Sequence, residues 1–239
     1  MLDVHAPHKA THTWTDFFIH IGTIAVGLLL AIGLEQSVEA IHQAHERRAL
    51  IESFHRECTA NLKSFDLDLD IVRQNVDWAR SSLALLRNAK PQGGYITVTL
   101  QPGLISGMHA PSRSVWSVAK SSGKVELLPE NLAEVFDRVD NEAVHFNDLV
   151  QTSVSAGERI SSFKERVGSP LDTGETIHLT LAQRDDAASL IDSLLVQYEQ
   201  YRLWLSSWEG ASQSVLDGVQ TRDAMDSYIH RAHVATAQQ

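Results

Sequence analysis

Residues 17–34, FFIHIGTIAVGLLLAIGL, constrain the fold of this chain more than any other stretch. These eighteen residues include no charged side chain and one ionisable group, His20. At about 1.5 Å of rise per residue, a helix of this length spans roughly 27 Å, close to the thickness of the hydrocarbon core of a bilayer. The sequence therefore predicts one transmembrane helix.

Two other interpretations of this run stay open. A secretory signal has an apolar core of about 7 to 15 residues behind a basic leader. This run is longer, and only Lys9 precedes it against Asp3 and Asp16, although residues 31–33 (AIG) would serve as a cleavage site. A helix buried in a soluble core would normally carry a polar stripe, and this one carries none. We therefore prefer the membrane span.

Small residues recur on one face of this helix. Thr23, Gly27 and Ala31 are four residues apart, so they share a face that another membrane helix could approach closely. This spacing predicts a docking seam, although small residues are also common in membrane helices that dock nothing. Trp14 and Phe17 stand at the start of the run, where we expect them to anchor the helix at the membrane interface.

Charge and cysteine content exclude several classes of function. The formal net charge is −10, and residues 1–34 contribute only −1, so residues 35–239 carry −9. This charge argues against nucleic acid as a partner and against a surface lying flat on anionic lipid. Cys58 is the single cysteine, so no intrachain disulfide forms.

The chain is predicted to be all-α, with residues 1–16 as a polar tail, 17–34 as the transmembrane helix and 35–239 as an extramembrane antiparallel helical bundle. His5, His8 and His12 in the tail would share a helical face, but Pro7 argues against a helix there, so we expect a solvated tail rather than a metal site. Few basic residues flank the span. We expect the tail in the cytoplasm of a bacterium and the large acidic domain in the periplasm.

Apolar spacing defines the helices of the bundle. Residues 35–89 contain neither Pro nor Gly, and their apolar residues recur every three or four positions, which predicts a helix that continues from the span. Residues 95–100 (YITVTL) alternate like a short strand, for which we expect a loop or a minimal hairpin. The predicted seam of the long helix consists of Ile51, Phe54, Cys58, Leu62, Phe65, Leu69, Val72, Val76, Ala79, Leu83 and Leu86.

Three further segments complete the predicted bundle. Residues 112–121 form a short helix, and a long helix starts near Pro129 and stops at Gly168. Residues 171–179 are irregular or briefly extended. A last helix runs from about residue 180 to 232, with Gly210 and Gly218 as points where it bends. The aromatic residues of this helix predict bundle core rather than a cofactor site.

Two patterns resemble metal sites. A bundle with two Glu-x-x-His pairs and two more Glu on facing helices holds a ferritin-like two-metal centre. The pairs here flank the predicted seams or lie in a connection, so we interpret all of them as solvated edge residues. Asp66, Asp68 and Asp70 mimic half of a calcium loop but fall inside a helix, and we also expect them to be solvated. The four pairs are Glu39/His42, Glu52/His55, Glu142/His145 and Glu175/His178.

Two stretches resemble a known group of proteins. HTWTDFFIHIGTIAVGLLLAIGLEQSVEAIHQAH is similar to the opening of uncharacterised bacterial proteins with one N-terminal membrane helix and an α-helical extramembrane domain. SVWSVAKSSGKVELLPENL resembles the mid-chain segment of such proteins. The resemblance covers about a quarter of the chain. It implies a location, an architecture and a bacterial source, and it supplies no activity or catalytic residue.

The sequence therefore predicts a protein that is not an enzyme and has no metal, cofactor or catalytic residues. We expect an accessory subunit of the inner membrane, whose partners are the lipid bilayer and other membrane subunits or a second copy. Its host would be a larger complex, such as a photosynthetic or respiratory one. The alternatives are a membrane-anchored sensor or adaptor and, less favoured, a di-metal enzyme in the bundle.

Overall fold

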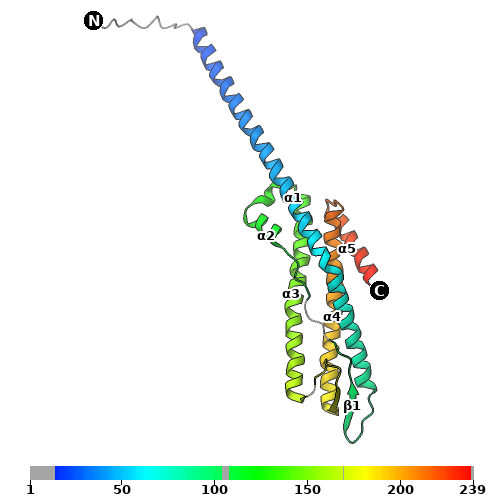
Figure 1. Ribbon diagram of the computed structural model, residues 1–239. Helices are drawn as coiled ribbons and strands as arrows, with labels where there is room; N and C mark the ends of the chain where they lie inside the picture. Colours follow the sequence, from blue (N-terminus) through cyan, green and yellow to red (C-terminus); the bar gives the residue numbers. More distant parts are fainter. Residues whose placement is uncertain (1–13, 104–107, 169, 238–239) are drawn as a thin grey trace, which may run out of the picture. The chain divides into compact units, whose positions relative to one another are not determined.

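The computed structural model describes residues 14–103, 108–168 and 170–237 (Figure 1). The chain divides into two units, Met1–Ala49 and Leu50–Gln239. His5, His8 and His12 lie outside the described residues. The described part is predominantly α-helical, as predicted. Its elements are α1 (Trp14–Asn88), β1 (Tyr95–Thr99), α2 (Ser114–Ser121), a 3₁₀ turn (Lys124–Leu127), α3 (Glu130–Val167), β2 (Thr176–Thr180), α4 (Leu181–Leu216) and α5 (Arg222–Ala237).

Helix α1 contains the whole predicted span and the predicted 35–89 helix up to Asn88 as one element of 75 residues. It begins at Trp14, within the stretch assigned to the tail. No residue of α1 before Leu50 is buried, and from Leu50 onwards burial follows the predicted seam. Of that seam, Ile51 and Leu62 are partly buried and all the others are buried. The three-or-four spacing therefore located the buried face of this part of the helix correctly.

The described residues between 50 and 237 form two hydrophobic clusters. One joins the C-terminal half of α1 to β1, β2, α3 and α4, and includes Phe65, Phe146 and Trp208. The other joins the residues around Phe54 of α1 to α2, α3, α4 and α5, and includes Trp116. Phe54 stacks on Phe136 of α3 with ring centroids 4.1 Å apart.

Polar contacts connect the same helices. Arg80 and Arg87 of α1 form ion pairs with Glu199 and Asp192 of α4, at 2.6 and 3.3 Å. The Tyr201 hydroxyl of α4 donates to the Leu149 carbonyl of α3 at 2.7 Å. In Figure 1, α3 and α4 lie side by side over most of their length, in agreement with these contacts.

The two strands pair with each other, antiparallel, with Thr97 opposite His178. The strand predicted at 95–100 is confirmed, but the minimal hairpin is wrong, because its partner comes from residues 176–180. The turn at Gly93 and Gly94 closes only a bridge between Gln92 and Tyr95. In β1 and in β2, every second residue is buried. Pairing the two strands places these buried residues on one face of the sheet, and a short local turn supplies no such partner strand.

Helix ends follow the turn residues with one exception. Helix α3 starts directly after Pro129 and ends at Gly168, whose φ of 70° caps the helix in the left-handed region. The single helix predicted for 180–232 is wrong, because α4 ends at Leu216 and α5 starts at Arg222. Gly218, with a φ of 76°, adopts a conformation that only glycine tolerates well, so it breaks the helix rather than bending it.

Gly210, in contrast, does not end the helix. It stays inside α4, where a Cβ atom would lie 2.8 Å from Cα of Ile229 in α5. The absence of a side chain therefore lets the backbones of α4 and α5 approach closely.

Candidate functional site

The predicted docking seam lies on the exposed part of α1. The Thr23 hydroxyl donates to the Ile19 carbonyl at 2.9 Å, which satisfies it within the helix. A Cβ atom added at Gly27 would meet no atom within 4 Å. Ala31 is exposed as well. The face that carries these three residues is therefore open in the single chain.

The predicted interface anchors lie together at the start of α1. Trp14 is 77% exposed and Phe17 52%, and their ring centroids are 6.0 Å apart in an edge-on arrangement. Phe18, which the sequence analysis did not single out, contacts both rings. The three aromatic rings form the kind of exposed cluster that membrane interfaces favour.

Within the described residues, α1 is the one helix long and apolar enough to cross a bilayer. Its most apolar window of 18 residues has a mean hydropathy of 2.3, and none of that window is buried. The interpretation as a core helix of a soluble protein does not fit, because such a helix would be covered by its own chain. Length and composition do not separate a membrane span from a signal sequence.

Glu142 corrects the interpretation of the Glu-x-x-His pairs. Glu39, His42, Glu52, Glu175 and His178 are exposed and His55 is partly buried, so solvated residues account for three pairs. Glu142, in contrast, is 1% exposed. It lies on α3 where α4 and α5 pack against that helix. The sequence predicted α4 and α5 as one continuous helix, so this packing was not expected.

The surroundings of Glu142 combine burial with positive charge. Arg138, one turn earlier, is 2.9 Å from Oε1, whereas Oε2 has no hydrogen-bond partner among the described residues. Burial raises the pKa of Glu142 above its usual range, although Arg138 and the imidazoles of His145 and His233 act in the opposite direction. Keeping the Glu142 carboxylate ionised in this buried position therefore costs free energy.

Both imidazoles near Glu142 are fixed by residues of α4. The His145 ring lies over Trp204 with centroids 4.8 Å apart. His233 of α5 is 2.6 Å from the Ser207 hydroxyl. These contacts show how the three helices converge on Glu142.

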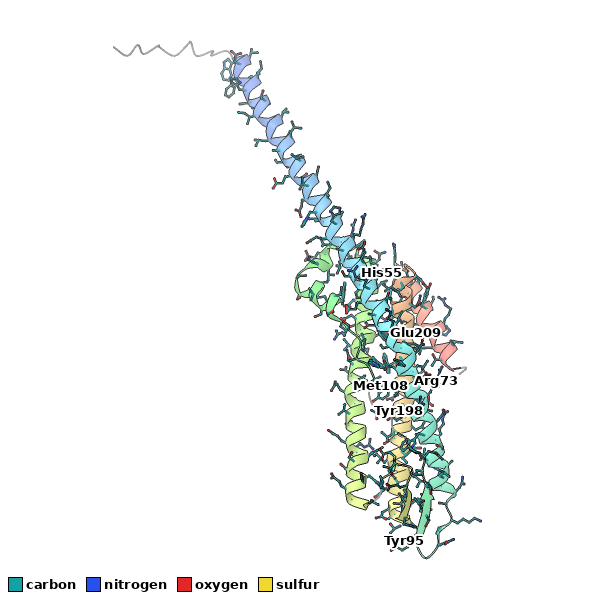
Figure 2. All side chains as sticks on the ribbon, viewed as in Figure 1. His55, Arg73, Tyr95, Met108, Tyr198 and Glu209 are labelled. Atoms are coloured by element: carbon teal, nitrogen blue, oxygen red, sulfur yellow. The ribbon has the colours of Figure 1, made fainter. Side chains whose placement is uncertain are left out.

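Asp68 is also not a solvated carboxylate. Asp66 and Asp70 are exposed as predicted, but Asp68 is fully buried. Its Oδ1 accepts hydrogen bonds from the backbone N–H of His109 at 3.0 Å and lies 2.9 Å from His109 Nδ1. Figure 2 labels the neighbouring Met108, which packs against the hydrophobic core. Asp68 thus attaches the segment after β1 to α1.

The start of α2 is held by a second buried carboxylate. Glu57 of α1 accepts from the Ser112 hydroxyl at 2.8 Å and from the Val115 backbone N–H at 2.7 Å. This N–H is one of the four that a helix cannot satisfy internally at its start. Glu57 therefore caps α2 from another element.

Asp140 of α3 connects α2 and the residue before it to the same region. It pairs with Arg113 at 2.7 Å and Lys120 at 2.8 Å. Burial raises the pKa of Asp140, but its two cationic partners together hold the value below the usual range. Trp116 donates its indole N–H to Asp137 at 3.1 Å. These pairs are satisfied, so we assign them a structural role.

The described residues contain no group of three or more His, Cys, Asp or Glu side chains arranged to hold a metal ion. A cavity of about 10 Å³ lies among α1, α2, α3 and α4, next to Cys58 and Trp208. Such a space suits one water molecule at most. Burial raises the pKa of the Cys58 thiol to about 12, which makes it a poor nucleophile.

Comparisons with protein-family models, with curated proteins and with solved structures found no match to this chain. The candidate site is therefore defined by geometry alone. Its most prominent feature is the exposed face of α1, and sequence spacing located that face. Sequence spacing did not reveal Glu142 or Asp68, because each is buried by a segment far away in the chain.

Proposed function

We propose that this protein is a non-catalytic accessory subunit of a larger complex in the bacterial inner membrane, with photosynthetic and respiratory complexes as candidate hosts. α1 anchors it, and the acidic helical bundle of residues 50–239 lies on the periplasmic side. The observation that carries the proposal is that the apolar part of α1 is wholly exposed and bears an open face of small residues. A bilayer covers most of such a helix, and a neighbouring helix covers the small-residue face.

The polar clusters support a structural rather than a catalytic unit. Glu57 and Asp140 accept hydrogen bonds from α2 and the residues just before it, and Asp68 accepts one from the segment after β1. None of these carboxylates lies beside an activated nucleophile in the described contacts. The role of residues 50–239 is then to present a folded acidic surface to neighbouring subunits.

A sensor or adaptor is the second candidate. α1 is a single helix that belongs to both units, and a continuous helix can carry a displacement from one end to the other. We rank it second because this requires two states of α1, and the structure describes one.

The docking face is tested with Gly27→Leu. At a close helix contact the added side chain separates the two backbones, whereas a helix facing lipid accommodates leucine as readily as glycine. We expect the variant to insert normally and to recover clearly less of its partners when tagged protein is purified from native membranes in mild detergent.

Gly22→Leu and Gly33→Leu are matched controls. Both glycines are as open as Gly27 and gain the same side chain, but they lie about 120–140° away around the helix. Both controls should recover partners like the parent. If Gly27→Leu recovers the same partners as the controls, or if the parent recovers none, the docking face is not used and the proposal fails.

A further inference from the structure

The apolar face of α1 continues beyond the membrane run with a regular spacing. Its members are separated alternately by three and four residues, which is the 3.5-residue repeat of a coiled-coil seam. Val38 and Ile41 extend the repeat into a stretch that also contains Glu35, Glu39 and Glu46. The residues of this face, called the stalk seam below, are Ile24, Gly27, Ala31, Leu34, Val38 and Ile41.

The stalk seam has no cover in its own chain. Leu34 is 68% exposed, Val38 61% and Ile41 59%. Burial in α1 begins only at Leu50. Val38 and Ile41 continue the spacing of the membrane run into polar sequence, so they are part of a pattern rather than isolated exposed residues, and a pattern of this kind marks a partner helix.

We propose that the stalk seam pairs with the stalk seam of a second copy of this chain, as a parallel two-stranded coiled coil. All copies insert into the membrane in the same direction, so two copies are related by a two-fold axis along the membrane normal. Their helices are then parallel and in register, and each seam residue meets its own counterpart. The two-fold symmetry supplies the geometry that a parallel coiled coil requires.

The residue types suit this pairing. In heptad terms, the a positions are Ile24, Ala31 and Val38, and the d positions are Gly27, Leu34 and Ile41. Two of the three a residues are β-branched and the central d residue is leucine, and β-branched a with leucine d favours two strands. The flanking e and g positions between 35 and 44 are Glu35, Ser37, His42 and Ala44, so no row of like charges opposes a second copy. The next a position is His45 and the next d position is Arg48, and each would face its own counterpart. The seam therefore ends before the buried part of α1 begins.

The contact would extend across the membrane surface. Ile24 and Leu34 supply large apolar side chains within the membrane run, and Val38 and Ile41 supply them beyond it. Within the bilayer, Gly27 and Ala31 contribute by letting the backbones approach.

This inference rests on the membrane insertion in the proposed function, but not on docking to other subunits. Disulfide cross-linking in native membranes tests it with the full-length chain. Val38→Cys and Ile41→Cys place a thiol in the seam, and Gln36→Cys and Gln43→Cys place one on the far side of the same helical turns. The parent is the blank, because Cys58, its one cysteine, is buried.

Under mild oxidation, we expect the two seam variants to form a disulfide-linked species of twice the chain mass, several-fold more than the far-side variants. Equal yields at seam and far-side positions, or no product at 38 and 41, would overturn the proposal and leave lipid headgroups as the cover. A cross-linked product of any other mass would overturn it too, because a different protein would then occupy the seam.

A second measurement separates this inference from the proposed function. Leu34→Cys should cross-link, and adding Ile41→Glu should reduce its yield several-fold, whereas adding Gln43→Glu should not. Both double variants must remain in the membrane fraction. If the tagged parent recovers no protein other than its own copies while the Val38→Cys product persists, the accessory-subunit proposal fails and the self-pairing stands.

Discussion

Glu142 is buried although the spacing of apolar residues in its own helix predicts an exposed side chain. On α3 it occupies a position next to Ala143 that periodicity places at the edge of the seam. It is buried because α5 returns over α3 and α4, with His233 of α5 beside Ser207 of α4. The same carboxylate on an isolated α3 would be solvated.

The raised pKa of Glu142 makes a prediction about stability and pH. The folded pKa lies above the unfolded value, so the stabilisation from protonating Glu142 is fully present below the unfolded pKa and is lost as pH rises through the folded pKa. At neutral pH the ionised carboxylate is buried at a cost. Glu142→Gln removes the charge and keeps an acceptor for Arg138.

We expect Glu142→Gln to raise the free energy of unfolding at pH 7 by about 1–2 kcal/mol, because burying a neutral amide costs less than burying an ionised carboxylate. The gain should shrink towards pH 4. Chemical denaturation at several pH values measures it. Glu134→Gln, an exposed change on the same helix, is the control and should have little effect. A Glu142→Gln protein that is less stable than the parent at pH 7 would show that the Arg138 pair outweighs the burial cost.

At the scale of elements, the break between α4 and α5 decides how the C-terminal part packs. Gly218 ends α4, and α5 then buries Met225 and Ile229 against the same cluster as Phe54 and Trp116. A continuous helix would have carried these two side chains away from that cluster. The left-handed conformation at one glycine therefore completes the second hydrophobic cluster.

Gly210→Ala tests the close approach of α4 and α5. Its Cβ would lie 2.8 Å from Cα of Ile229, and backbone atoms cannot move aside as a flexible side chain can. We expect a loss of about 1–3 kcal/mol in the free energy of unfolding, typical of overpacking. Hydrogen exchange in residues 222–237 should become faster as α5 is displaced.

The matched control for this change is Gly157→Ala on α3. An added Cβ at Gly157 meets no atom within 4 Å, and alanine is the better helix former by roughly 0.5–1 kcal/mol. Gly157→Ala should therefore stabilise slightly. Thermal melting that ranks the two variants in the opposite order would contradict the packing of α5 on α4.

At the scale of the whole molecule, the exposed apolar helix determines where the protein can be stable. Residues 17–34 would leave a long apolar surface in water, whereas a bilayer covers it and the helix satisfies its own backbone groups. We expect the full-length chain to stay in the pellet after alkaline carbonate extraction and to enter solution only with detergent.

Two arginines in the middle of the run should abolish this behaviour. Each arginine near the centre of a membrane helix costs about 2.5–3.5 kcal/mol on insertion, so Val26→Arg with Leu29→Arg costs at least about 5 kcal/mol. Gln36→Arg, outside the run, is the control and should remain in the pellet. Recovery of the intact parent in the carbonate supernatant would refute membrane insertion.

The sequence by itself determined the features that depend on neighbouring residues. The apolar run, the buried face of α1 from Phe54 to Leu86, the start of α3 at Pro129 and its end at Gly168 were all predicted, because each follows from helical spacing or from a turn residue. Val154 of α3 is an exception, since it continues the apolar spacing of Phe146 and Val150 but is 58% exposed. Periodicity shows which side chains share a face, but not how far along the helix a partner covers it.

The tertiary structure alone decided everything that joins distant segments. It paired β1 with β2 rather than closing a hairpin, and it returned α5 over α4, which buried Glu142. It also joined Asp68 and Glu57 to partners 41 and 58 residues away in the chain. Local spacing contains no information about these partners. Their positions result from the balance between burying apolar surface and giving buried polar groups hydrogen-bond partners, and that balance exists only when the whole chain is folded.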